Sequence, residues 1–214
     1  MGSMDDLRRR VPGRFTKFTF LRHAQSEGNS VGLRQSKLPG TPLSETGKTQ
    51  AQKTAKRLRG IHEKEPFDLL ISSPLLRCQQ TAKILGAALQ MEAQTDDLIR
   101  EIDFGDSEGK RDSELKDDMA RSRALSSEER FRNKIGKTGE SHCDTVARSL
   151  DFVKKIIREH PGKSILVVGH SDGIRFLFKE LENRSLETVY QNGHLPHCEP
   201  MTVTIDNETG TVAD

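Results

Sequence analysis

The sequence predicts an α/β protein: a three-layer sandwich in which a mostly parallel central sheet carries helices on both faces. Short apolar runs such as "FDLLIS" and "SILVVG" are continuous, as in strands buried on both sides. These runs alternate along the chain with segments of helical periodicity, a pattern typical of parallel strands joined by helices. The chain has 214 residues, enough for one domain with its own core, and we expect residues 15–214 to form it.

The first predicted strand and helix follow from local composition. Residues 15–21 are rich in β-forming side chains and predict a strand. Residues 44–59 predict a helix, with Ser44 as its N-cap and Gly60 as its stop.

The second strand and helix show clearer periodicity. Residues 67–72 form the continuous run "FDLLIS" and predict a buried strand. A helix is predicted to start at Ser73-Pro74, with proline at its first position. Its inward face repeats every three or four residues and comprises Leu75, Cys78, Ala82, Leu85 and Leu89.

The last third of the chain repeats this alternation. A helix is predicted from the Ser141 and Asp144 capping box to Pro161-Gly162. Residues 164–169 predict a buried strand that leads through His170 into a further helix, and "MTVTIDNETGTV" predicts a strand with a tight turn.

Two segments do not fit the alternating pattern. Residues 1–14 are expected to be a disordered N-terminal arm that begins with the tag remnant "MGSM". Residues 110–137 are dense in charge and predict an insertion over one edge of the sheet, with a helical piece at residues 113–125. A lid and an inert solvated insertion are equally good interpretations of this segment.

Composition narrows the choice of partner and compartment. Lys+Arg is 34 and Asp+Glu is 32, a net charge of +2 that favours neither nucleic acid nor a membrane surface. Three widely spaced cysteines and the lack of a signal peptide or spanning run predict a reduced cytoplasmic protein. The stretch "HLPHC" is too weak a signal to predict zinc.

Candidate catalytic residues follow the predicted strands, at the sheet edge where α/β proteins bind ligands. Arg22 and His23 end the first strand, Arg77 opens the helix after the second, His170 follows "SILVVG", and Glu101 lies on a loop. Arginine forks match phosphate oxygens, a neutral imidazole is a nucleophile, and a carboxyl can protonate a leaving alcohol. Each residue alone has an ordinary structural explanation, so the hypothesis depends on their coincidence.

Six segments resemble, in order and spacing, the signature of the histidine phosphatase superfamily, also called the phosphoglycerate mutase-like superfamily. They are "LRHAQSEGN", "PLSETGKTQA", "ISSPLLRCQQTA", "REIDFGDSEG", "GES" followed by Arg148, and "VVGHSDGIR". The resemblance implies a phosphoglycerate mutase-like fold over the whole domain. It also implies a metal-independent phosphatase without a cofactor that acts on a small phosphorylated metabolite, with a phosphoprotein as the other possibility.

The resemblance also implies a role for each site residue. His23 is expected to carry the phosphoryl group as phosphohistidine, and Glu101 to protonate the leaving group. The phosphate pocket is expected to comprise Arg22, Arg77 and His170, with Asn29, Ser26 and Ser171 as further phosphate or substrate contacts.

Departures from the family pattern affect which substrate we expect more than which class of enzyme we expect. Ala24 replaces the usual glycine, Gly40 stands where many members have aspartate, and Ser107 replaces a tryptophan at the expected pocket rim. Ile102-Asp103-Phe104-Gly105 differs from the sequence that follows the glutamate in mutases, which favours hydrolysis.

Two alternatives remain open. One is a phosphoglycerate mutase or bisphosphoglycerate phosphatase, and the other is a catalytically weak module that binds phosphorylated ligands. The sequence does not predict the oligomeric state.

Overall fold

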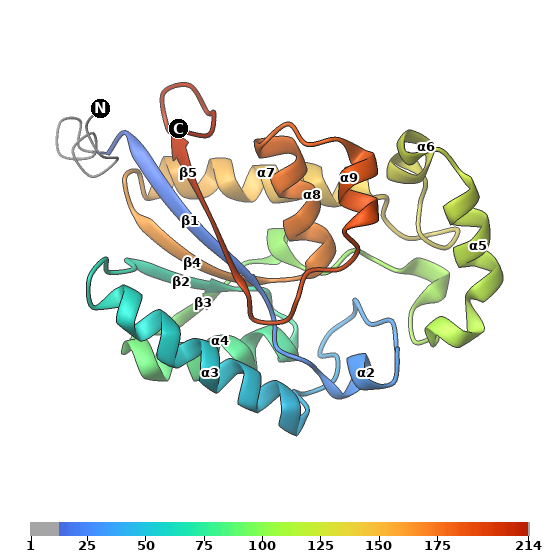
Figure 1. Cartoon of the computed structure of the whole chain (residues 1–214), viewed down its shortest axis with the longest axis horizontal. Helices are drawn as coiled ribbons and strands as arrows, with labels where there is room; N and C mark the ends of the chain where they lie inside the picture. Colours follow the sequence, from blue (N-terminus) through green and yellow to red (C-terminus); the bar gives the residue numbers. More distant parts are fainter. Residues whose placement is uncertain (1–12, 214) are drawn as a thin grey trace.

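A five-stranded sheet lies between two layers of helices in the computed structural model, which describes residues 13–213 (Figure 1). The strand order is β3-β2-β4-β1-β5, and only β5 runs antiparallel to its neighbour among the described strands. The predicted three-layer architecture with a mostly parallel sheet is confirmed. The strands are β1 (Phe15–Arg22), β2 (Leu69–Ser72), β3 (Ala93–Thr95), β4 (Ser164–Gly169) and β5 (Pro200–Asp206).

Two pairs of longer helices cover the sheet. One face carries α3 (Glu45–His62) and α4 (Leu76–Leu89), and the other carries α7 (His142–Glu159) and α8 (Ser171–Leu181) (Figure 1). Shorter helices lie in the connections: α2 (Glu27–Ser30), α5 (Lys116–Ala124), α6 (Ser127–Arg132), α9 (Leu186–Gln191), and the 3₁₀ turns η1 (Asp97–Ile99), η2 (Gly105–Ser107) and η3 (Asp112–Glu114).

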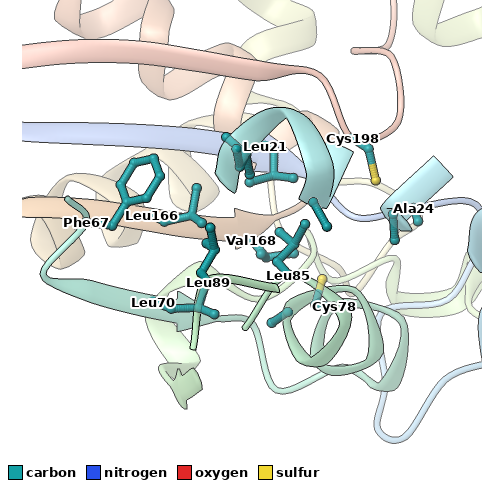
Figure 2. Close-up of a cluster of buried hydrophobic side chains, with 14 of the residues drawn as sticks. Leu21, Ala24, Phe67, Leu70, Cys78, Leu85, Leu89, Leu166, Val168 and Cys198 are labelled. Carbon is teal, nitrogen blue, oxygen red and sulfur yellow. The ribbon is translucent and has the colours of Figure 1, made fainter. Parts of the chain in front are cut away.

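Alternate residues of β4 feed two separate hydrophobic clusters. Leu166 and Val168 pack with the inner faces of α3 and α4, in the cluster that Figure 2 shows. Ile165 and Val167 point the other way, toward aromatic and aliphatic side chains of α7 and α8. Because both faces are buried, β4 has no polar position inside it, which is why its sequence is a continuous apolar run.

Helix boundaries follow the predicted caps at two places and differ at two others. Ser44 caps α3, and Ser141 forms the predicted capping box at the start of α7. Gly60 does not end α3, because an exposed helical glycine costs only about 1 kcal/mol and the helix runs on to His62. Pro74 is not the first residue of α4, since Leu75 stays extended as the N-cap.

The charged insertion contacts the rest of the protein at several points, among them a bridge from Arg111 to Leu33 and the buried side chain of Leu115. Helix α5 buries none of its residues, whereas Phe131 of α6 is buried against Phe176 of α8. Figure 1 shows α5 and α6 together at one end of the molecule, beyond α9.

Residues 1–12 of the predicted arm lie outside the described residues. Arg14, its last residue, donates to the Asp206 carboxylate at 2.7 Å. Within residues 13–213, no helix is long and apolar enough to span a membrane.

The carboxyl ends of three parallel strands meet at one edge of the sheet. Arg22 pairs with Gly169, and Ser72 pairs with Val168. The His23 N–H donates to the Gly169 carbonyl at 2.9 Å, so the ladder continues one residue beyond β1. This register places residues 22–23, 72–73 and 169–170 side by side.

Candidate active site

Four of the predicted residues form one buried polar cluster at this edge. Arg77 Nε lies 3.0 Å from His23 Nε2, and Arg77 Nη2 lies 3.3 Å from His170 Nδ1. Glu101 Oε2 is 3.3 Å from the same His170 nitrogen and 3.5 Å from Arg77 Nη2. The two imidazole rings have centroids 5.2 Å apart. Residues far apart in the sequence therefore share one site.

His23 has a defined tautomer. Its Nδ1 lies 2.7 Å from the Ala24 carbonyl oxygen, which can only accept, so the proton is on Nδ1. The lone pair is then on Nε2, where Arg77 Nε donates to it. Burial, with the positive charge of Arg77 and the neighbouring His170, holds the pKa of His23 well below its ordinary value. The ring is thus a neutral base at neutral pH.

Arg77 reaches the site from the first turn of α4, where the helix dipole adds favourable potential for an anion. The side chain is almost completely buried, and its Nη2 donates to the Gln35 carbonyl at 2.8 Å. Gly40 takes a positive φ of 74°, and a Cβ there would lie 3.1 Å from Arg77 Nη1. A glycine at position 40 therefore leaves room for the guanidinium.

His170 is held from the opposite side of its ring. Its Nε2 lies 2.8 Å from Ser73 Oγ, which leaves Nδ1 facing Arg77 and Glu101. Burial lowers the pKa of His170 to about 4, although the Glu101 carboxylate opposes this shift. The imidazole is therefore neutral at neutral pH, and its Nδ1 faces both the Arg77 donor and the Glu101 acceptor.

Glu101 is ionised in the resting site. Burial raises its pKa, but the neighbouring His170 and Arg77 outweigh burial and leave the pKa below its ordinary value. A bound phosphate dianion would reverse the balance by adding negative charge beside the carboxylate.

Arg22 is the last residue of β1, and its guanidinium is only partly paired. Its Nη1 donates to the Leu195 carbonyl at 2.7 Å, while its buried Nε has no partner among residues 13–213. Burial lowers the pKa of Arg22, and Glu101 opposes that shift. An arginine keeps its charge even so. An unpaired, buried and charged donor is costly, and an anion would satisfy it.

The remaining three predicted residues make no hydrogen bond to this cluster within residues 13–213. Ser26 and Asn29 cap α2: Asn29 Oδ1 accepts from the Ser26 N–H at 3.1 Å and from its hydroxyl at 3.0 Å. Ser171 begins α8 next to His170, and its Oγ accepts from the Leu195 N–H at 2.9 Å.

Sequence reasoning missed His197. Its Nδ1 donates to the His23 carbonyl at 2.7 Å, and its ring centroid lies 5.5 Å from that of His23. The stretch "HLPHC" drew attention to this histidine, but as a weak metal signal. Ser107, which replaces a tryptophan of the family pattern, is buried and not part of an open rim.

The cluster suits an anion better than a metal ion. His23, Glu101 and His170 each present a ligand atom within 4.8 Å of the others, close enough to share one metal ion. Arg77, however, donates to His23 Nε2 and lies 3.5 Å from Glu101 Oε2. A cation would face that fixed positive charge and would have to displace the donor.

Comparison with known proteins places the chain in a family. The sequence model of the histidine phosphatase superfamily (branch 1) matches residues 18–214. The chain belongs to this superfamily. Phosphoserine phosphatase 1 of Hydrogenobacter thermophilus is 30% identical, over 83% of this chain and 81% of its own.

Two further similar proteins are a phosphoglycerate mutase and a phosphatase of known structure. A 2,3-bisphosphoglycerate-dependent phosphoglycerate mutase 2 of Gloeobacter violaceus is 30% identical, over 85% of this chain and 82% of its own. The solved phosphoserine phosphatase of Entamoeba histolytica, in complex with 3-phosphoglyceric acid, has a TM-score of 0.74 and 25% identity. That alignment covers 92% of this chain and 94% of the other. The fold is therefore phosphoglycerate mutase-like, as predicted.

Arg148 of α7 holds the loop that carries Glu101. Its guanidinium donates to the carbonyls of Leu98, Arg100 and Glu101 at 2.9, 2.8 and 3.0 Å. It also forms a bidentate pair with the Glu140 carboxylate, both contacts at 2.9 Å. One side chain thus ties the acidic loop to α7.

Arg148→Ala is expected to lower the free energy of unfolding by about 2 kcal/mol and to reduce turnover, because the Glu101 loop loses its anchor. Arg158→Ala, an exposed arginine on the same helix, is the matched control and should change neither. Urea denaturation and steady-state kinetics would measure both effects. Equal stabilities of the two variants would contradict this account of Arg148.

Proposed function

We propose that this histidine phosphatase hydrolyses small phosphomonoesters without a metal ion, through a phosphohistidine on His23. The observation that carries the proposal is the state of His23: Nδ1–H is fixed on the Ala24 carbonyl, and the Nε2 lone pair faces Arg77. A neutral nucleophilic atom surrounded by anion-binding donors is what phosphoryl transfer requires.

In the first step, His23 Nε2 attacks phosphorus and the bond from phosphorus to the ester oxygen breaks. Arg22 and Arg77 offset the negative charge on the phosphoryl oxygens, and His170 is placed to donate to one of them once it gains a proton. Glu101 gives its proton to the leaving oxygen, so the product is a neutral alcohol. Glu101 gains this proton in one of two ways. The substrate phosphate brings it into the site, or the bound dianion raises the pKa of Glu101 so that the carboxyl takes a proton from solvent.

In the second step, a water molecule attacks the phosphohistidine. Glu101, now a carboxylate, accepts a proton from this water, and the phosphorus–nitrogen bond breaks. Inorganic phosphate leaves, His23 regains its lone pair, and Glu101 loses the proton as the empty site returns to its ionised resting state. One carboxyl therefore serves both steps.

The substrate is proposed to be a small phosphorylated metabolite. A phosphoserine phosphatase and a mutase of phosphoglycerate are among the relatives, which supports a panel of small carboxylated phosphomonoesters as the first substrates to assay. The basic side chains of Arg34 and Arg111 lie in the segments where the family pattern is weakest. They are candidates for contact with a second anionic group.

The alternative function is that of a phosphoglycerate mutase or bisphosphoglycerate phosphatase. The similarity to a phosphoglycerate mutase supports this alternative. A mutase needs a phosphorylated starting enzyme and returns the phosphoryl group to the sugar acid. Activity that depends on a 2,3-bisphosphoglycerate primer would identify this alternative. Release of inorganic phosphate without any primer would support the phosphatase.

The proposed function predicts phosphatase activity that survives chelation. Because Arg77 occupies the position where a cation would have to sit, EDTA should leave the rate on p-nitrophenyl phosphate unchanged. A rapid acid-free quench with ³²P-labelled substrate should trap a phosphoprotein that is stable to alkali and labile to acid. Loss of activity with EDTA, restored by a divalent metal, would refute the metal-independent mechanism.

A further inference from the structure

Residues 195–198 form a strap across the end of β1. The Leu195 carbonyl accepts from Arg22 Nη1 at 2.7 Å, and the Cys198 N–H donates to the Arg22 carbonyl at 2.9 Å. The strap is in turn fixed to α8, because the Leu195 N–H donates to Ser171 Oγ at 2.9 Å. It therefore binds both the side chain and the backbone of the residue that precedes His23.

His197 continues this binding to His23 itself. The peptide group between His23 and Ala24 is held at both ends: its oxygen accepts from His197 Nδ1 at 2.7 Å, and its N–H donates to Thr81 Oγ1 at 3.1 Å. The next carbonyl, that of Ala24, holds the Nδ1 proton of His23. The orientation of this peptide plane thus determines where the acceptor of that proton lies, and hence where Nε2 points.

Two backbone positions of the strap cannot supply the donor to the His23 carbonyl. Pro196 lacks an N–H, and the Cys198 N–H already donates to the Arg22 carbonyl. The imidazole of His197 supplies the donor to this carbonyl, one residue beyond the end of β1. Burial, with Arg22 beside it, lowers the pKa of His197 to about 4, so the ring is neutral at neutral pH.

We propose that His197 is a positioning residue for His23, whose Nδ1–H bond to the His23 carbonyl holds the peptide plane that aims Nε2 at phosphorus. This inference rests on the proposed function, since it assigns His23 as the nucleophile. It gives a role to a histidine that lies outside the phosphate-binding cluster. It predicts an effect on the rate of phosphoryl transfer and little effect on substrate binding.

Two substitutions at position 197 separate the donor from the bulk of the ring. His197→Leu keeps an apolar side chain without a donor, whereas His197→Asn keeps an N–H donor close to the position of Nδ1. We expect the rate of phosphoenzyme formation to fall about 10- to 100-fold in the leucine variant, because a small misplacement of a reacting atom has effects of that size. The asparagine variant should stay within about threefold of the wild type, with KM unchanged in both.

The matched control is Thr54→Val, since Thr54 Oγ1 donates to the Cys198 carbonyl at 3.0 Å and anchors the same strap away from His23. Its phosphorylation rate should equal that of the wild type. The ring ¹⁵N shifts of His23 give a second readout that does not depend on turnover. They should show mixed tautomers in His197→Leu and a single Nδ1–H tautomer in His197→Asn and Thr54→Val.

Three results would overturn the inference in folded variants: a wild-type rate in His197→Leu, equal losses in the leucine and asparagine variants, or an equal loss in Thr54→Val. A leucine variant that does not fold would leave the asparagine variant to decide, by its rate and its His23 tautomer. A failure of the proposed function would be distinguishable from a failure of this inference. The proposed function is wrong if His23→Ala turns over like the wild type, whereas an inactive His23→Ala with an unaffected His197→Leu removes the positioning role alone.

Discussion

His23→Ala is expected to lower kcat/KM on p-nitrophenyl phosphate by about 10⁴-fold or more, since the loss of a covalent nucleophile has effects of this size. No other described side chain can replace it. His170 lies 5.2 Å away, but its Nε2 is held by Ser73 and its Nδ1 faces Glu101. The variant should still bind phosphate, because Arg22 and Arg77 remain. It should not form the acid-labile phosphoprotein.

The control for His23→Ala is His160→Ala. His160 ends α7, and its carbonyl accepts from the Lys163 N–H just before β4 begins, which is the end of the strand away from the site. It should have wild-type kinetics. Phosphorylation that persists in His23→Ala, or that maps to another histidine in the wild type, would show that the nucleophile is wrongly assigned.

The strands and helices that the sequence predicted are those with strong local signals. The runs that became β2 and β4 have apolar side chains on both faces, and the N-caps of α3 and α7 satisfy backbone donors from adjacent residues. Strand β3 was missed because its three residues are exposed at the edge of the sheet. Nothing in its composition separates it from a loop, and only pairing with β2 makes it a strand.

The clustering of the site residues was predictable because it follows from the topology of a parallel sheet. Parallel strands joined by helices bring their carboxyl ends to a single edge, so Arg22, His23 and His170 had to meet there. His197 was not predictable, since its partner lies 174 residues away and its contact depends on how the strap crosses β1. The charge state of Glu101 depends in the same way on distances that no sequence pattern contains.

Glu101→Gln is expected to slow the hydrolysis of alkyl phosphates by about 10³-fold, and that of an activated aryl phosphate far less. An alkoxide needs a proton in order to leave, whereas a nitrophenolate is stable without one. Glutamine cannot supply that proton, although it fits the same space. Measuring kcat/KM for a series of leaving groups with the wild type and the variant tests this role. Equal losses across the series would mean that Glu101 only positions the other groups.

The pH profile of the wild type should also depend on the proton that Glu101 donates to the leaving group. Because the pKa of Glu101 lies below its ordinary value in the resting site, the carboxyl is ionised at neutral pH and the proton must arrive with the substrate. Phosphate monoesters lose their second proton near pH 6, so kcat/KM on alkyl phosphates should fall about tenfold per pH unit above that value.

On the acid side activity should persist, since the pKa of His23 is held well below its ordinary value and its nucleophilic nitrogen stays unprotonated. In Glu101→Gln the alkaline decline should be much shallower on the aryl substrate, because the step that used the proton no longer limits the rate. A decline of unchanged steepness in that variant would show that the proton is needed for a step other than protonation of the leaving group by Glu101. The leaving-group series and the pH profile thus test one proton by two independent measurements.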